Sequence, residues 1–118
     1  MSHNAISRVG SGIRVKTGYG HAVDIHGNLV ENGTRTGLSI AGGGMTVTEN
    51  DVQGFRVGID IISNASGVPD VIQDNDFGGN AATDCRDRTG VTIGSLANTW
   101  IADRGSKAKS APWGLCHP

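Results

Sequence analysis

The segment Val47–Ile61, with the sequence VTENDVQGFRVGIDI, contains the pattern from which the fold of this chain is predicted. Asn50 has an apolar residue three positions before it and another two positions after it, Val47 and Val52. The end of the segment, Gly58-Ile59-Asp60-Ile61, alternates apolar and polar side chains, and this period of two is typical of a strand with one buried face. Asn and Gly separate these stretches, and both residues accept turn conformations at low cost. The segment therefore predicts short strands joined by tight turns.

The same pattern recurs along the chain. Asparagines follow one another at intervals of 22 to 25 residues, at Asn4, Asn28, Asn50, Asn75 and Asn98. A large apolar residue lies two positions after each one, at Ile6, Val30, Val52, Phe77 and Trp100. Repeats of this length indicate supersecondary units that stack on one another. We predict an all-β parallel solenoid of about four to five coils, with coils spaced about 4.8 Å apart.

Stacked coils place equivalent residues in columns. Inward columns are expected for Ile25, Val47 and Ile72, for Ile13, Leu38 and Ile59, and for Val15, Ile40 and Ile61. The repeated asparagines are expected to form a structural ladder of side-chain amides at one corner. Residues 1–90 are predicted to form the regular coils, and residues 91–118 the last coil and an irregular C-terminal cap.

Charge and hydropathy exclude two classes of partner. The net charge is −1 without a basic stretch, whereas nucleic-acid binding depends on neutralising phosphates. The sequence has no apolar run of 18 residues, so no membrane span is expected. Met1-Ser2-His3-Asn4 also lacks the features of a secretory signal. If Asn4 is a corner, its strand lies before Met1, which predicts either missing upstream coils or an edge covered by another subunit of a homo-oligomer.

The chain has two cysteines, Cys85 and Cys116, which bracket its least regular part. A disulfide between them would close a loop of 30 intervening residues. Such a bond predicts an oxidising, extracellular or periplasmic setting. Two free thiols are the alternative.

The repeated Asn-x-apolar unit followed by Gly-Ile-x-Ile resembles the right-handed parallel β-helix proteins of the pectate-lyase-like superfamily, including NosD-like and carbohydrate-processing repeats. Asp84-Cys85-Arg86-Asp87, Ala97-Asn98-Thr99-Trp100 and Pro112-Trp113-Gly114-Leu115-Cys116 look like the C-terminal part of secreted bacterial members. The resemblance implies a right-handed coil and a polysaccharide ligand. The Asn-Thr-Asp, Asp-Asp, Gly-His-Gly and Arg-Ile-Lys motifs of polygalacturonase-like members do not occur in this chain.

One set of outward residues is a candidate carbohydrate-binding site. Arg14, Ser39 and Asp60 occupy the polar position of the alternating segments, with Asp84 expected to continue the column and Arg86 expected nearby. Arginine binds a uronate carboxylate bidentately, and Asp accepts hydrogen bonds from sugar hydroxyls. Ion pairs between surface side chains account for the same residues.

A second set of residues is a candidate for catalysis. Tyr19, His21 and His26 lie close together in the sequence, and Arg14 is a further candidate. Tyr and His suit a lyase or epimerase that removes a proton next to a carboxyl group. The alternative interpretation is that these residues lie on an exposed strand surface and have no catalytic role.

Four carboxylates flank the asparagines of two consecutive coils, at Glu49, Asp51, Asp74 and Asp76. Their mutual repulsion would be relieved by calcium, which binds several oxygen ligands. Calcium is therefore the candidate cofactor, and a solvated acidic corner is the alternative.

These observations favour a structural or carbohydrate-binding module of an extracellular protein, without catalysis of its own. A polysaccharide lyase or epimerase segment acting on an acidic polysaccharide is the first alternative. A self-assembling spike or filament element that pairs through its N-terminal edge is the second.

Overall fold

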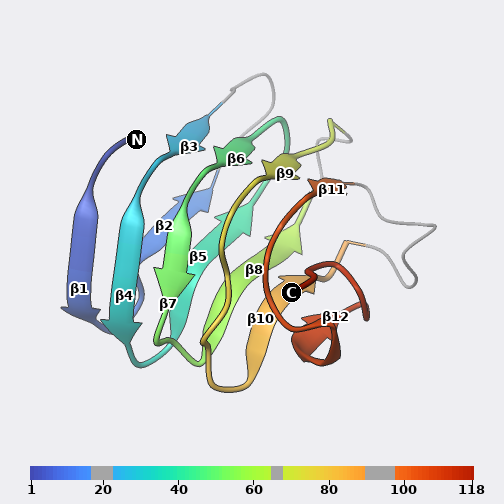
Figure 1. Ribbon diagram of the computed structural model, residues 1–118. Helices are drawn as coiled ribbons and strands as arrows, with labels where there is room; N and C mark the ends of the chain where they lie inside the picture. The colour runs from blue at the N-terminus through green and yellow to red at the C-terminus, as the bar shows by residue number, and fades with distance from the viewer. Residues whose placement is uncertain (17–22, 65–67, 90–97) are drawn as a thin grey trace.

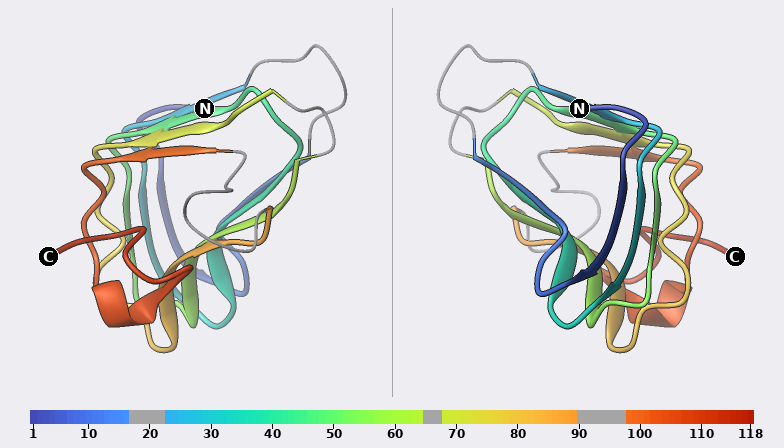
Figure 2. Two further views of the ribbon diagram at one scale, coloured as in Figure 1. Left: turned by 90° about the vertical axis from the view of Figure 1, so that its right-hand side faces the viewer. Right: turned by 90° about the vertical axis from the view of Figure 1, so that its left-hand side faces the viewer.

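The computed structural model describes residues 1–16, 23–64, 68–89 and 98–118. The chain forms a parallel β-solenoid of about four turns, with one sheet along each of three sides (Figure 1). Viewed from its N-terminal end, the chain winds clockwise as it recedes, so the solenoid is right-handed (Figure 2). The predicted fold class is confirmed.

The three sheets each take one strand from successive coils. The three-stranded sheet contains β1 (Ala5–Val9), β4 (Leu29–Gly33) and β7 (Asp51–Gln53). The five-stranded sheet contains β2 (Ile13–Lys16), β5 (Thr36–Ala41), β8 (Val57–Ser63), β10 (Thr83–Asp87) and β12 (Ser110–Ala111). The four-stranded sheet contains β3 (Asp24–His26), β6 (Thr46–Thr48), β9 (Val71–Gln73) and β11 (Thr99–Ile101). A short 3-10 helix, η2 (Lys107–Lys109), directly precedes β12.

The inward columns stack as predicted. Ile25, Val47 and Ile72 are direct neighbours across β3, β6 and β9, and Ile13, Leu38 and Ile59 are neighbours across β2, β5 and β8. These side chains and their equivalents form one buried core that runs along the solenoid axis. Burial of apolar surface stabilises the stack by about 25 cal/mol per Å².

The asparagine ladder is present, but its fifth position is not Asn98. Asn4, Asn28, Asn50 and Asn75 are linked in turn, each donating its side-chain amide to Oδ1 of the next. Asn75 then donates to Asp103, 28 residues further along the chain. The last interval is longer than the earlier ones, so the predicted spacing of 23 residues pointed to the wrong residue.

The longer fourth coil also shifts Trp100. The sequence placed Trp100 after Phe77, whereas in the structure it pairs with Ile72 and continues the Ile25 column. Its ring lies edge-on to Phe77, with 6.5 Å between centroids.

The first residues of the chain differ from expectation. The strand preceding Asn4 was expected before Met1, but Ser2 forms a parallel bridge with His26 of β3. The Met1 amino group also donates to the carbonyl of Asp24 at 2.7 Å. Residues 1–3 therefore extend the four-stranded sheet.

In the described ranges, no helix has the length and apolar character needed to cross a membrane.

Candidate functional site

The predicted outward column exists on the five-stranded sheet. Arg14, Ser39, Asp60 and Arg86 are consecutive neighbours across β2, β5, β8 and β10. They point away from the core because the residues on either side of them, such as Ile59 and Ile61, point inward. The strand register therefore brings together four of the five residues predicted for carbohydrate binding.

Asp60 is the centre of this column. Its carboxylate accepts two hydrogen bonds from Arg86, Nε to Oδ1 at 3.1 Å and a terminal nitrogen to Oδ2 at 2.8 Å. Arg88 makes the same pair of bonds to the same two oxygens, at 3.1 and 2.7 Å. The Asp60 side chain is 5% exposed, while those of Arg86 and Arg88 are 31% and 49% exposed. One buried carboxylate thus fixes two guanidinium groups at the surface.

The arrangement has an excess of positive charge. Arg86 and Arg88 together carry two positive charges against the single negative charge of Asp60. Arg14 and Lys16 are exposed at the start of the same sheet, and between them and Asp60 lie the short side chains of Ser39 and Ala41. We refer to Arg14, Lys16, Ser39, Asp60, Arg86 and Arg88 as the basic face. It is suited to bind an anionic group, because guanidinium N–H groups pair bidentately with carboxylate, sulfate or phosphate.

Arg88 was not among the predicted residues. It follows β10, beyond the repeated Gly-apolar-polar-apolar unit that identified the other positions. Its two-residue spacing from Arg86 is the signal that would have found it, because alternate residues of an extended chain point to the same side.

Asp84 does not belong to the basic face, contrary to prediction. Arg86 is the residue opposite Asp60, so Asp84 lies two positions too early. The Asp84 carboxylate is buried and accepts hydrogen bonds from the backbone N–H groups of Asn80 and Ser106, at 3.1 and 2.8 Å. It tethers the C-terminal segment and borders a polar groove of about 380 Å³ that Arg104 and Lys109 also line.

The catalytic candidates do not share one site in the described structure. Tyr19 and His21 lie outside the described residues. His26 lies on the four-stranded sheet, whereas Arg14 lies on the five-stranded sheet. The Nδ1 atom of His26 is 2.9 Å from Thr48 Oγ1, and its Nε2 atom is 3.9 Å from the Glu49 carboxylate.

The four carboxylates of the calcium prediction do not converge. Asp51 and Asp76 are neighbours through a parallel bridge, and burial, followed by the charges of Asp76 and Glu31, raises the pKa of Asp51. Asp74 instead accepts a hydrogen bond from the side chain of Gln73, and Glu49 approaches His26. Within the described part of the chain, no three His, Cys, Asp or Glu residues are arranged to hold a metal ion.

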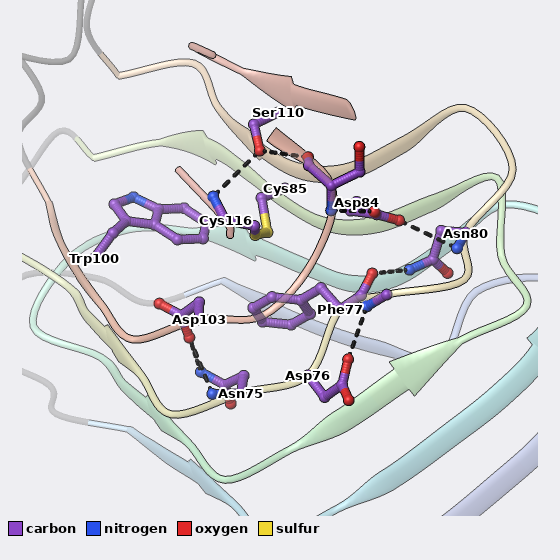
Figure 3. Close-up of a disulfide and its surroundings, with 12 residues drawn as sticks. Asn75, Asp76, Phe77, Asn80, Asp84, Cys85, Trp100, Asp103, Ser110 and Cys116 are labelled. Atoms are coloured by element: carbon purple, nitrogen blue, oxygen red, sulfur yellow. Dashed lines mark hydrogen bonds between the residues drawn. A yellow bond between two sulfur atoms is a disulfide. The ribbon is translucent and has the colours of Figure 1, made fainter. Parts of the chain in front are cut away.

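The predicted disulfide joins Cys85 and Cys116, whose Cα atoms are 6.1 Å apart (Figure 3). Both residues are fully buried, and Cys85 continues the core column of Ile59. The bond holds the C-terminal segment against β10, the strand that carries Arg86. The alternative of two free thiols is wrong.

Comparison with protein-family models, with curated proteins and with solved structures found no match to this chain.

Proposed function

We propose that this chain is a binding module for an acidic polysaccharide, and that the basic face of the five-stranded sheet is its ligand site. The observation that carries the proposal is the double bidentate contact of Arg86 and Arg88 with Asp60. Both guanidinium groups are held in place before any ligand arrives, so binding costs less side-chain entropy than flexible surface arginines would. A guanidinium group has further N–H donors that can pair with a carboxylate or sulfate.

The repeat supports a polymer as ligand. Residues of the column recur at the coil spacing of about 4.8 Å, so charged groups are presented in a row along the solenoid axis. A chain of acidic sugars laid along that row would meet Arg14 at one end and the Arg86–Arg88 pair at the other. A relationship to the pectate-lyase-like superfamily is part of the proposal, supported by the right-handed three-sheet coil and the asparagine ladder.

An extracellular or periplasmic location also belongs to the proposal. The Cys85–Cys116 disulfide supports it, because such bonds persist in oxidising compartments.

The test is affinity electrophoresis and calorimetry of the full chain with polygalacturonate, alginate and, as neutral control, dextran. We expect binding to the acidic polymers that weakens with salt, and loss of at least tenfold in affinity for the Arg86→Ala/Arg88→Ala variant. Arg104→Ala is the matched control, because Arg104 is exposed and continues the Asp51–Asp76 series instead. Equal affinity of both variants and the wild type would contradict the proposal.

The same mixtures distinguish binding from catalysis. Mass spectrometry of the polysaccharide after incubation is expected to find intact polymer. Unsaturated or epimerised products that disappear in a His26→Ala variant would support the lyase or epimerase alternative instead.

A specific observation favours self-association as a second function. Ile6, Val9 and Val15 of the outermost strands β1 and β2 are only partly buried. Contact with a second copy would cover them and pair the strand edges. A molecular mass of one chain across concentrations in analytical ultracentrifugation would contradict this candidate, whereas a dimer that a Val15→Lys variant dissociates would support it.

A further inference from the structure

Asp103 occupies the fifth position of a ladder whose earlier members are asparagines. In each Asn–Asn step, the Oδ1 atom of the later residue accepts two hydrogen bonds from the earlier one. Asn50 donates its backbone N–H and its side-chain amide to Asn75 Oδ1, at 2.9 and 3.0 Å. Asn75 makes the same two bonds to Asp103 Oδ1, at 3.0 and 2.8 Å (Figure 3). Oδ1 of Asp103 therefore accepts the same two hydrogen bonds as the side-chain oxygen of an asparagine in the ladder.

Asp103 differs from asparagine at its second side-chain atom, where an oxygen replaces the amide nitrogen. In the ladder, the amide nitrogen also donates to the carbonyl oxygen three residues before the preceding asparagine. Asn50 donates to Ile25 and Asn75 donates to Val47, both at 2.9 Å. By the same repeat, the second oxygen of Asp103 is expected opposite the carbonyl of Ile72. That oxygen, Oδ2, is buried and has no hydrogen-bond partner among the described residues.

An ionised Asp103 would place two hydrogen-bond acceptors opposite each other in a buried corner. A buried acceptor without a donor destabilises the folded state, and more strongly if it is charged. A proton on Oδ2 removes the charge and supplies the missing donor. We propose that Asp103 joins the ladder as a neutral carboxylic acid, whose O–H donates a hydrogen bond where an asparagine would donate its amide N–H. The bound proton thereby stabilises the packing of the last coil on the preceding one.

The electrostatic surroundings of Asp103 agree with this. Burial raises its pKa to about 6, although hydrogen bonds from the side chain and backbone of Asn75 and from the backbone of Ile101 act in the opposite direction. Asp74, on the preceding coil, raises the pKa further. On the following coil, the backbone N–H of His117 donates to the Asp103 carbonyl, and the side chains of Arg104 and His117 are exposed to solvent.

Asp70 is a second buried carboxyl group of this kind, near the start of β11. Its Oδ1 atom accepts from the Met45 backbone at 2.9 Å, and Oδ2 is buried without a partner in the described chain. Burial and the charge of Asp87 raise its pKa to about 6, against the effect of the Met45 hydrogen bond. Asp70 also donates its backbone N–H to Asn98, directly before β11. Asp70 and Asp103 therefore lie at the two ends of β11.

The sign of the pH effect follows from the raised pKa values. In the unfolded chain both carboxyl groups ionise near their ordinary pKa of 3.8, whereas in the folded chain they keep their protons to about pH 6. Their stabilising contribution is therefore complete below about pH 4 and lost as the pH rises through 6. A difference of about two pH units corresponds to about a 100-fold change in the unfolding equilibrium constant for each group.

The test is urea unfolding of the full, disulfide-bonded chain at pH 5 and pH 8, with the Asp103→Asn variant and Asp24→Asn as control. Asp24 is exposed on β3, so its substitution is expected to leave the pH dependence of the wild type unchanged. Asp103→Asn is expected to reduce the change in the unfolding equilibrium constant between pH 5 and pH 8 by about tenfold, because at pH 5 only part of the full effect is present, and to be more stable than the wild type at pH 8. A variant destabilised equally at both pH values would overturn the proposal.

Carboxyl NMR of the folded wild type gives a second readout that no substitution disturbs. The Asp103 resonance is expected to titrate near pH 6. A midpoint at or below 4 would show that the carboxyl enters the ladder ionised, and would overturn the proposal by itself.

Discussion

Val52 of β7 fills the space in which Gly37 of β5 would carry a side chain. A Cβ atom built on Gly37 would collide with Val52 Cγ1 and lie 2.8 Å from the carbonyl oxygen of Gly58. The three-stranded and five-stranded sheets approach closely at this point because the glycine presents only backbone. The glycine that begins each alternating segment is therefore required for packing, and in β5 and β8 it lies within the strand rather than in a turn.

Gly37→Ala is expected to destabilise the fold by about 1–3 kcal/mol, the usual cost of overpacking a core. Gly10→Ala is the control, because a Cβ there would meet only Thr34 Oγ1 at 3.9 Å. Urea unfolding measures both. Equal stability of the two variants would show that the structure around Gly37 can shift to accommodate a Cβ atom without a loss of stability.

Val52→Asp is expected to prevent stable folding. Val52 is fully buried between Val30 and Phe77, so the new carboxylate would lie in the core without a partner. Circular dichroism and thermal melting report the outcome. Ala5→Asp introduces the same charge at an exposed position of the three-stranded sheet and is expected to retain the wild-type melting temperature within a few degrees. An unchanged melting temperature for Val52→Asp would refute the register of this column.

Reduction of Cys85–Cys116 is expected to lower the free energy of unfolding by about 3–4 kcal/mol, as chain-entropy models give for a loop of this size. Urea unfolding with and without reductant measures the difference, and a Cys85→Ala/Cys116→Ala variant should be insensitive to the reductant. If reduction leaves the wild type unchanged, the C-terminal segment is held by its other contacts alone.

Trp100→Phe is expected to cost about 1–3 kcal/mol, because it leaves a buried acceptor with one donor fewer. The indole N–H of Trp100 donates to Asp87 Oδ2 at 2.9 Å, and Asp87 is almost completely buried. Trp113 is 64% exposed, so Trp113→Phe is expected to change stability by less than about 0.5 kcal/mol. Chemical unfolding followed by circular dichroism compares the two without relying on either indole as a probe. A similar small effect of both substitutions would mean that Asp87 replaces the lost donor.

The inward columns and the basic face were predictable to different extents. Apolar alternation identifies positions such as Leu38 and Ile59 because a shift by one residue would expose the whole buried face of a strand. It also locates Arg14, Ser39 and Asp60, which lie between those positions. The limits appear in the fourth coil, where the ladder interval lengthens to 28 residues and Asp103, instead of Asn98, becomes the next member.

Asp87 shows why the remainder of the fourth coil was difficult to predict. It follows Ile61 in an inward column, a place where a charged residue is not expected. Trp100, Asn98 and Thr89 donate to its carboxylate, and these donors come together only in the folded chain. Likewise, the pairing of Arg88 with Asp60 depends on contact between side chains that are 28 residues apart.

The two charged surfaces described above lie on different sides of the solenoid. The basic face carries four cations and Asp60, whereas the side of the three-stranded sheet carries the anions Glu31, Asp51 and Asp76 with the cations Arg8 and Arg104. A net charge of −1 therefore conceals an uneven charge distribution, which gives the coil an electric dipole with its positive end at the basic face. Near a negatively charged matrix, this dipole turns the molecule so that the five-stranded sheet approaches first, and dissolved salt weakens that alignment over a Debye length of about 8 Å.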